Sequence, residues 1–222
     1  MKVSLKKHNY PGFLIVACGV DGAGKSSALD KFVDSIISEG HKETNIVRLR
    51  QPSDWWRTDR HVRSTFLKKG DGEKFDEFAL GVFGAADRLN QQALLIEPAL
   101  RVGKTVVIDR YVFCLFAHYM AKSEGNIPYL TRLCELLFWP DITFILDCPP
   151  EIAINRVSKR DGSNEAMADQ QIGPTTKFRN AYIALAHKNN FKIISSIENP
   201  EKVSQEMMRI YRSEMFQSKL KI

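Results

Sequence analysis

The 222-residue sequence predicts an α/β fold of three layers, in which a doubly wound, five-stranded parallel sheet has helices on both faces. Two observations lead to this prediction. Five short apolar runs rich in β-branched residues have the composition of strands that are buried on both faces. Segments with helical periodicity separate these runs, and an alternation of strand and helix is typical of a parallel sheet.

The predicted strands cover residues 13–18, 45–49, 105–108, 142–146 and 191–195. The predicted helices lie at residues 25–39, 74–102, 113–137, 150–160, 172–189 and 200–213. No repeat, low-complexity tract or linker interrupts the pattern, so we expect one domain over residues 1–222. Residues 161–176 are polar and contain two glycines and one proline, so we expect a short lid at about residues 160–176.

Composition limits the class of partner. The net charge of +6 suits an anionic ligand, but Lys and Arg are scattered and never form a run of five, which argues against nucleic acid as the main partner. The four cysteines form no Cys-x-x-Cys pair, and we interpret them as small apolar residues of a reducing compartment. No stretch approaches the roughly 20 apolar residues of a membrane span. We therefore expect a cytoplasmic protein without a membrane partner.

A phosphate-binding loop follows the first predicted strand. The segment Gly19-Val-Asp-Gly-Ala-Gly-Lys-Ser26 fits the pattern G-x-x-x-x-G-K-[ST] and opens the first predicted helix. Its glycines let backbone N–H groups turn into one concavity, and the helix N-terminus adds partial positive charge. The fold is therefore expected to be of the P-loop NTPase type, with ATP as phosphoryl donor. Lys25 would reach the β- and γ-phosphates, and the Ser26 hydroxyl would be a ligand of Mg²⁺.

The residues predicted to bind ATP are Gly19, Val20, Asp21, Gly22, Ala23, Gly24, Lys25, Ser26 and Ser27, together with Arg156. The sequence lacks Asn-Lys-x-Asp and Leu-Ser-Gly-Gly-Gln. These absences disfavour a guanine-specific GTPase and a transporter ATPase.

A charged pair, Asp109 and Arg110, comes at the end of the third predicted strand. Open α/β sheets bind ligands outside the carboxyl ends of their strands. A cation in this place more often meets an anionic ligand, although Arg110 in a structural salt bridge is the alternative.

Several motifs together resemble one family, the thymidylate kinases among the nucleoside monophosphate kinases. The phosphate loop carries an acidic residue at its third position, as this family does. The further matching segments are Arg50-Gln-Pro52, Ala85-Ala-Asp-Arg88, Pro98-Ala-Leu100, Asp109-Arg-Tyr111, Leu146-Asp-Cys-Pro-Pro-Glu-Ile-Ala153 and Phe178-Arg-Asn-Ala-Tyr182. The resemblance spans nearly the whole chain, and it implies transfer of the γ-phosphoryl group of ATP to a pyrimidine deoxynucleoside monophosphate, dTMP above all.

The resemblance also implies roles for single residues. Arg50 and Arg110 would bind the phosphate of the acceptor, and Arg88 its base or sugar-phosphate. Asp21 would contact the 3′-hydroxyl or the phosphate region of the acceptor, unless it only forms the turn. Asp109 would orient Mg²⁺ through water beside Ser26, unless it only caps the next helix. The residues expected to act in catalysis are Lys25, Asp21, Arg110 and Arg160.

Three positions depart from the family, and all concern the base and sugar. Gly84 stands where an aromatic residue usually stacks on thymine, Cys114 replaces a serine, and His118 replaces an aromatic residue that disfavours a ribose 2′-hydroxyl. Phe83 is adjacent to Gly84 but lies about 100° around the helix. We therefore expect weaker discrimination between dTMP and other pyrimidine monophosphates. We also expect Phe83, Gly84, Cys114 and His118 to lie at the binding site of the acceptor. The pair Trp55 and Trp56 is another source of a stacking surface.

The helix that carries Gly84 is amphipathic. Phe75, Phe78, Ala79, Val82, Phe83, Ala86 and Leu89 form an apolar stripe, which we expect to face the core. Gly81, Gly84 and Arg88 lie off that stripe. Two glycines inside a helix cost about 1 kcal/mol each relative to alanine, so they indicate close approach of a bound base or of a neighbouring helix.

The family supplies a transition-state arginine from the loop or the lid. Gly22 occupies the loop position, and residues 161–176 contain no Lys or Arg, so the nearest cations are Arg156, Lys159 and Arg160. Arg156 and Arg160 are four residues apart and repel on a bare helix unless an anion bridges them. ATP phosphates are the favoured anion, and a solvated face is the alternative.

Two other functions stay open. A kinase of the same family that acts on UMP, CMP or dCMP would explain the altered base and sugar positions. A non-catalytic P-loop protein that senses nucleotides or binds nucleic acid has less support, since Lys25, Ser26, Asp109 and Arg110 are all present. A homodimer is compatible with the sequence.

Overall fold

The computed structural model describes residues 1–65, 72–122, 125, 127–162 and 165–219, and its centre is a five-stranded parallel sheet. The strand order is β2-β3-β1-β4-β5. The strands are β1 (Phe13–Cys18), β2 (Ile46–Arg50), β3 (Thr105–Asp109), β4 (Ile142–Asp147) and β5 (Lys192–Ser195). The predicted fold class is confirmed, and each strand lies within one residue of its predicted range at either end.

The strand register brings the polar strand ends together. In the central strand β1, every residue after Phe13 is buried, as its apolar sequence requires. Ala17 pairs with Asp109 across β1 and β3, and Asp109 pairs in turn with Arg50 of β2. The carboxyl ends of three neighbouring strands therefore lie side by side, and the phosphate loop follows the central one.

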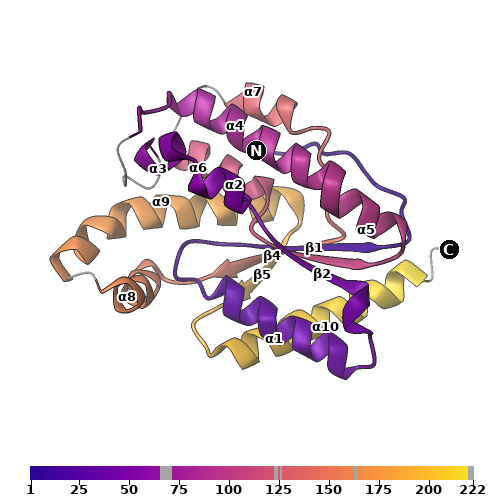
Figure 1. Ribbon diagram of the computed structural model, residues 1–222. Helices are drawn as coiled ribbons and strands as arrows, with labels where there is room; N and C mark the ends of the chain where they lie inside the picture. Colours follow the sequence, from indigo (N-terminus) through magenta and orange to yellow (C-terminus); the bar gives the residue numbers. More distant parts are fainter. Residues whose placement is uncertain (66–71, 123–124, 126, 163–164, 220–222) are drawn as a thin grey trace.

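Two layers of helices cover the sheet (Figure 1). Helices α1 (Lys25–Ser38) and α10 (Pro200–Lys219) pack together on one face. The helices besides α1 and α10 are η1 (Glu43–Asn45), α2 (Asp54–Thr58), α3 (Arg60–Thr65), α4 (Glu77–Gln91), the π-helix η2 (Gln92–Ile96), α5 (Glu97–Arg101), α6 (Val112–Lys122), α7 (Ile127–Leu133), α8 (Pro150–Asp161) and α9 (Glu165–Asn189). The other face of the sheet carries α4, α5, α6 and α9, with α7 above them.

Three helical predictions differ from the structure. The predicted helix over residues 113–137 is two helices, α6 and α7, because Gly125 and Pro128 favour a break followed by a new first turn. The predicted helix at 172–189 begins earlier, at Glu165, so much of the expected lid is helical. Helices α2 and α3 occupy a segment for which no element was predicted.

Helix α4 faces the core with a different side from the predicted one. The buried residues are Leu80, Gly81, Gly84, Ala85, Asp87, Arg88 and Gln91, whereas Ala79, Val82 and Ala86 of the predicted stripe are exposed. Two of the buried polar residues, Asp87 and Gln91, have hydrogen-bond partners on another segment, although Oε1 of Gln91 has none among the described residues. Asp87 accepts hydrogen bonds from Ser53, and Nε2 of Gln91 donates to the carbonyl of Arg50 at 3.2 Å. The predicted core stripe is therefore wrong.

In the part of the chain that the structure describes, no helix is long and apolar enough to cross a membrane.

Candidate active site

The phosphate loop has the backbone shape that the sequence predicts. Gly19, Gly22 and Gly24 all have positive φ angles, of 152°, 81° and 76°. A Cβ at Gly22 would overlap the carbonyl oxygen of Ala153 in α8, so only glycine fits there. The loop then leads directly into α1, whose first residue is Lys25.

Lys25 is buried under this loop, with 6% of its surface exposed. Its ammonium group donates hydrogen bonds to the carbonyl oxygens of Gly19, at 3.0 Å, and Val20, at 2.7 Å. Burial and the charge of Arg110 lower the pKa of Lys25 to about 8, against the opposing effect of Asp21. With this pKa, Lys25 is partly deprotonated at a pH near 8. Phosphate oxygens that replace the two carbonyls as partners would favour its charged ammonium form.

Ser26 and Asp109, which the sequence predicts as ligands of Mg²⁺, are in contact. The Ser26 hydroxyl donates to Oδ2 of Asp109 at 2.5 Å. Oδ1 of Asp109 is buried and has no hydrogen-bond partner among the described residues. A buried, unsatisfied carboxylate oxygen beside a hydroxyl fits Mg²⁺, which binds few protein oxygens and completes its shell with phosphate and water. Ser27 is the next residue of α1 and is exposed.

Asp21 and Arg110 join the phosphate loop to the end of β3. The guanidinium of Arg110 donates to Oδ1 of Asp21 in a short ion pair. Burial raises the pKa of Asp21, but the charges of Arg110 and Lys25 outweigh this effect and lower it. Arg110 adopts a positive φ of 69°, and its N–H donates to the carbonyl of Ala17 at 2.8 Å. Arginine rarely adopts this left-handed backbone conformation. Here the conformation holds the Arg110 side chain toward the phosphate loop.

A third arginine that sequence reasoning missed lies with Arg50 and Arg110. Nε of Arg57 donates to the carbonyl of Pro52 at 3.0 Å, and the side chain is half-buried. Burial, followed by the charges of Arg50 and Arg110, lowers the pKa of Arg57 to about 10. Like charges that repel in the free protein favour an anion between them. The sequence shows Arg57 five residues after Pro52 of the Arg-x-Pro motif. Its place beside Arg50 and Arg110, however, depends on the fold of α2, which was not predicted.

Arg88 and Gly84 lie together on the buried face of α4. Arg88 is 3% exposed, and its Nη1 donates to the Gly84 carbonyl at 2.6 Å. A Cβ at Gly84 would lie 3.7 Å from Nε1 of Trp56. Phe83 points elsewhere, with its ring packed against Trp55 at a centroid distance of 5.0 Å. Of these predicted acceptor residues, the structure brings Gly84 and Arg88 together and places Phe83 beside Trp55.

Cys114 and His118 face helix α9 from α6. Cys114 lies near Cys18, Arg110 and Tyr182. Burial opposes ionisation, yet the polar neighbour Cys18, the charge of Arg110 and the polar neighbour Tyr182 together lower the pKa of the Cys114 thiol to about 5. His118 lies one turn further along, with its ring centroid 5.4 Å from that of Phe178. All four cysteines are free, and Cys114 alone among them is not fully buried.

The His118 ring also meets charged neighbours. Its Nε2 lies 3.7 Å from Oε2 of Glu77 on α4. Burial and the charge of Lys122 lower the pKa of His118, while Glu77 opposes them. The predicted sugar-contacting position is thus at the junction of α4, α6 and α9.

The two arginines of α8 have different partners. Arg156 donates to the carbonyls of Ser196 and Ile197, both at 2.8 Å, and to Gly22 at 3.4 Å. Arg160 is 65% exposed and pairs with Asp161 at 2.7 Å, and its charge acts on Asp21 and Arg110. These hydrogen bonds to backbone carbonyls give Arg156 a structural role besides the predicted one. Its contact with the ATP phosphates stays a prediction.

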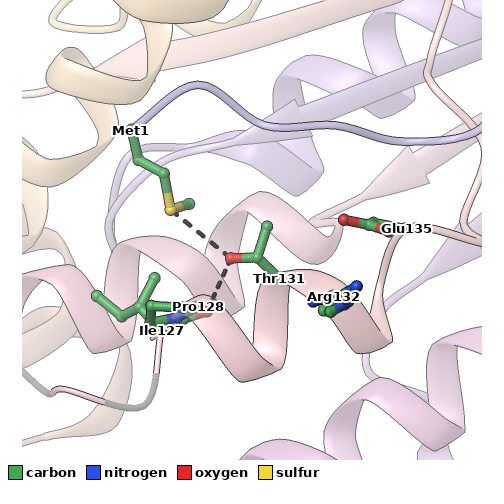
Figure 2. Close-up of a pocket in the computed structure, with 6 residues that line it drawn as sticks. All are labelled: Met1, Ile127, Pro128, Thr131, Arg132 and Glu135. Atoms are coloured by element: carbon green, nitrogen blue, oxygen red, sulfur yellow. Dashed lines mark hydrogen bonds between the residues drawn. The ribbon is translucent and has the colours of Figure 1, made fainter.

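A separate shallow depression contains none of the predicted site residues (Figure 2). It is lined by Met1 and by Ile127, Pro128, Thr131, Arg132 and Glu135 of α7 and the segment after it. Figure 2 shows the Thr131 hydroxyl between Sδ of Met1, at 3.7 Å, and the carbonyl of Ile127. These contacts tie the N-terminus to α7 and assemble no group of catalytic residues.

The sheet order, the phosphate loop and the charged strand ends define the class of protein as an α/β fold of the P-loop NTPase type. The model of one family, described as thymidylate kinase, matches residues 19–207. The chain therefore belongs to the thymidylate kinase family, a family of nucleoside monophosphate kinases, as the sequence motifs predicted.

Individual relatives agree with this assignment. The chain is 31% identical over 201 residues to a probable thymidylate kinase of Thermococcus kodakarensis, an alignment that covers 88% of this chain and 95% of the relative. It is 29% identical over 212 residues to a thymidylate kinase of Nitratidesulfovibrio vulgaris, covering 88% and 94%. The crystal structure of thymidylate kinase from Ehrlichia chaffeensis has a TM-score of 0.65 at 21% identity, covering 90% of this chain and 98% of that one. This last likeness supports the fold.

Proposed function

We propose that the chain transfers the γ-phosphoryl group of ATP to dTMP and forms dTDP. The observation that carries the proposal is the contact between Asp21 and Arg110. Asp21 belongs to the loop for the donor, whereas Arg110 is a cation that the family motif assigns to the acceptor. Phosphate sites built on these two residues would lie next to each other. Phosphoryl transfer needs this proximity, because the protein contributes mainly positioning and charge neutralisation.

Each phosphate site has its own cations. Lys25 and the loop N–H groups would bind the β- and γ-phosphates of ATP, with Arg160 as the cation nearest the lid. Arg50, Arg57 and Arg110 would bind the phosphate of the acceptor, and Arg88 its base or sugar. Ser26 and Asp109 would hold Mg²⁺, which neutralises phosphate charge when it is bound. Membership of the family favours dTMP over the UMP, CMP and dCMP alternatives.

The direct experiment is a coupled assay of ADP release with a panel of acceptors. The panel contains dTMP, dUMP, UMP, CMP and dCMP, each with saturating ATP and Mg²⁺. We expect the highest kcat/KM with dTMP, and a loss of at least about two orders of magnitude in kcat for Lys25→Ala. ADP release that is unaffected by Lys25→Ala, or faster with another acceptor than with dTMP, would overturn the proposal.

A homodimer and a cytoplasmic location stay predictions. Support for the homodimer comes from four exposed leucines near one another on the α4 side of the sheet. Leu94 and Leu95 lie on η2, and Leu133 and Leu136 on and after α7, with exposed fractions between 44% and 66%. The carbonyl of Leu136 accepts a hydrogen bond from Gln92 of η2 at 2.9 Å, so the two segments touch. Sedimentation of the protein and of Leu94→Glu/Leu136→Glu tests whether a second copy covers this surface.

A further inference from the structure

A carboxylate is buried between α4 and the segment that follows β2. Asp87 of α4 has only 1% of its surface exposed. Among the described residues, its carboxylate accepts two hydrogen bonds, and both come from Ser53. The N–H of Ser53 donates to Oδ2 at 2.9 Å, and the Ser53 hydroxyl donates to Oδ1 in a short contact. Burial of a carboxylate costs stability unless its partners compensate, and Ser53 supplies that compensation here.

Ser53 is the residue at which α2 begins. Its Oγ accepts a hydrogen bond from the N–H of Trp56 at 3.3 Å, and its carbonyl accepts one from the N–H of Arg57 at 3.1 Å. An N-cap residue of this kind satisfies the free N–H groups of the first turn. Helix α2 has five residues, which is too short for a helix to be stable by itself. Asp87 therefore fixes the position of α2 through the residue that starts it.

Arg57 is the cation that α2 adds to the cluster of Arg50, Arg57 and Arg110. Its Nε donates to the carbonyl of Pro52 at 3.0 Å, directly before Ser53 in the chain. The charges of Arg50 and Arg110 act on the Arg57 guanidinium. Arg50 ends β2 and Arg110 follows β3, so the sheet holds both of them. A shift of α2 would thus move Arg57 away from its two neighbours.

Helix α4 also contacts the other end of this segment. Nε2 of Gln91, one turn after Asp87, donates to the carbonyl of Arg50 at 3.2 Å. Pairing with β3 holds β2 as far as Arg50, and the N–H of Gln51 adds a bond to the carbonyl of Asp109 at 2.9 Å. Beyond that point the contacts with α4 take over the support of the segment.

We propose that Asp87 is a positioning residue for the acceptor phosphate, because it holds Ser53 and α2 so that Arg57 lies beside Arg50 and Arg110. This assignment rests on the proposed function, which takes the three arginines as the site of the acceptor phosphate. Asp87 itself does not touch the acceptor. It acts through the cap of α2.

The charge of Asp87 distinguishes a positioning role from an electrostatic one. A carboxylate near a phosphate site repels the phosphate, so a purely electrostatic role predicts a lower KM for dTMP when the charge is removed. A positioning role predicts the opposite, because Asp87→Asn cannot accept both hydrogen bonds from Ser53. We expect Asp87→Asn to raise the KM for dTMP about three- to tenfold, with the KM for ATP within about twofold. An unchanged or lower KM for dTMP would overturn the proposal.

Ser53 offers a second route to the same contact. Ser53→Ala removes the hydroxyl that meets Asp87 and caps α2, and Ser53 is only half-buried. We expect Ser53→Ala to raise the KM for dTMP at least about threefold, and Ser53→Thr, which keeps the hydroxyl, to stay within about twofold of the unmodified protein. Equal KM values in Ser53→Ala and the unmodified protein would contradict a role for the cap.

Asn189 provides the control for a loss of stability alone. Its Oδ1 accepts a hydrogen bond from the N–H of Val3 at 2.8 Å, at the end of α9 and before β5 begins. This is the edge of the sheet opposite the phosphate loop. Asn189→Ala should lower the unfolding temperature and leave the KM for dTMP within about twofold. A rise in KM as large as that of Asp87→Asn would show that any loss of stability disturbs the acceptor site.

A double-mutant cycle tests the path through Arg57. Arg57→Ala alone should raise the KM for dTMP about tenfold, because it removes a charged partner of the phosphate. If Asp87 acts through Arg57, adding Asp87→Asn to Arg57→Ala changes this KM by less than about twofold. Effects of the two substitutions that multiply would show that Asp87 acts independently of Arg57.

Hydrogen exchange followed by mass spectrometry separates this assignment from the proposed function, because it requires no turnover. Asp87→Asn should speed the exchange of the backbone amides of residues 54–58 at least about threefold, and Asn189→Ala should leave it unchanged. Unchanged exchange in Asp87→Asn overturns the positioning role, while dTMP turnover by the unmodified protein still supports the proposed function. Absence of dTMP turnover in the unmodified protein overturns the proposed function, and the positioning role with it.

Discussion

The hydroxyl of Ser26 and the carboxylate of Asp109 meet at 2.5 Å, although 83 residues separate them in the chain. The contact exists because β1 and β3 are adjacent parallel strands that end at the same edge of the sheet. The second carboxylate oxygen of Asp109 is buried and accepts no hydrogen bond from the described residues. This free oxygen fits the Mg²⁺ site that the sequence predicts at the start of α1.

The first prediction concerns Mg²⁺. Asp109→Asn keeps the size of the side chain but removes its charge, so we expect the rate to fall by about 10–100-fold, with half-maximal activity at a higher Mg²⁺ concentration. The measurement is the initial rate against free Mg²⁺ at saturating ATP and dTMP. Asp34→Asn is the control, because Asp34 is an exposed residue of α1. An unchanged Mg²⁺ requirement in Asp109→Asn would remove Asp109 from the metal site.

The second prediction concerns the pH dependence of ATP binding through Lys25. Its pKa is lowered from 10.5 to about 8 in the free protein, so the ammonium group loses its proton as the pH rises through 8. Bound phosphates favour the charged form, and ATP binding must then restore the proton. We expect the Kd for ATP to rise above pH 8, by at most about tenfold per pH unit, because one proton is linked to binding. The pKa of Asp21 is lowered and that of Arg110 raised, so neither titrates in this range.

Calorimetry at pH 7.0, 8.0 and 9.0, in buffers of different ionisation enthalpy, measures both the Kd and the proton uptake. Lys25→Arg is the control, since its guanidinium stays charged throughout. A Kd that is constant to pH 9, without proton uptake, would contradict the lowered pKa.

The sheet and the phosphate loop could be predicted from sequence because their signals are local. A buried strand, a glycine loop and a lysine at the start of a helix are adjacent in the chain, and each constrains the next. The cluster of Arg50, Arg57 and Arg110 could not be predicted in the same way. Arg57 belongs to α2, a helix of five residues that is too short to give a periodic signal.

The orientation of α4 was mispredicted for a related reason. Apolar residues were taken to mark the core face, but Asp87 and Gln91 are buried because distant residues supply their hydrogen bonds. Ser53 and Arg50 are those partners, and they lie on a different segment. The environment of Cys114 likewise depends on Cys18 and Tyr182, which only the tertiary fold brings to α6.

The third prediction concerns the reactivity of Cys114. With a pKa lowered to about 5, the thiol is already ionised at pH 6, whereas an ordinary thiol is not. We expect the rate of alkylation by iodoacetamide to vary less than threefold between pH 6 and 8, against about tenfold per pH unit for an ordinary thiol. Mass spectrometry identifies the labelled residue. Addition of dTMP should slow the labelling, because Cys114 lies beside Arg110.

Cys114→Ser provides the control for this labelling. The remaining cysteines, Cys18, Cys134 and Cys148, are buried, so the variant should react slowly at every pH. A labelling rate of Cys114 that rises in proportion to hydroxide concentration would show an ordinary thiol.

The fourth prediction separates the two phosphate sites. Arg110 is half-buried against the loop and the end of β3, whereas Arg160 is exposed on α8 and pairs with its neighbour Asp161. Arg110→Ala should raise the KM for dTMP and lower kcat, with the KM for ATP little changed, because we propose this cation for the acceptor site. Arg160→Ala should lower kcat at least tenfold with small changes in both KM values, since a cation near the lid acts most strongly in the transition state.

Steady-state kinetics with each substrate varied in turn distinguishes these patterns. Arg110→Lys retains a charge but loses the paired donors, so it should fall between Arg110→Ala and the unmodified protein. Arg209→Ala is the control for loss of a surface charge, because Arg209 is 70% exposed on α10 and pairs with Glu206. Thermal unfolding should show near-normal stability for Arg160→Ala, whose ion pair is exposed. If Arg110→Ala and Arg160→Ala both weaken ATP binding alone, both arginines belong to the donor site, and the acceptor phosphate must rely on Arg50 and Arg57.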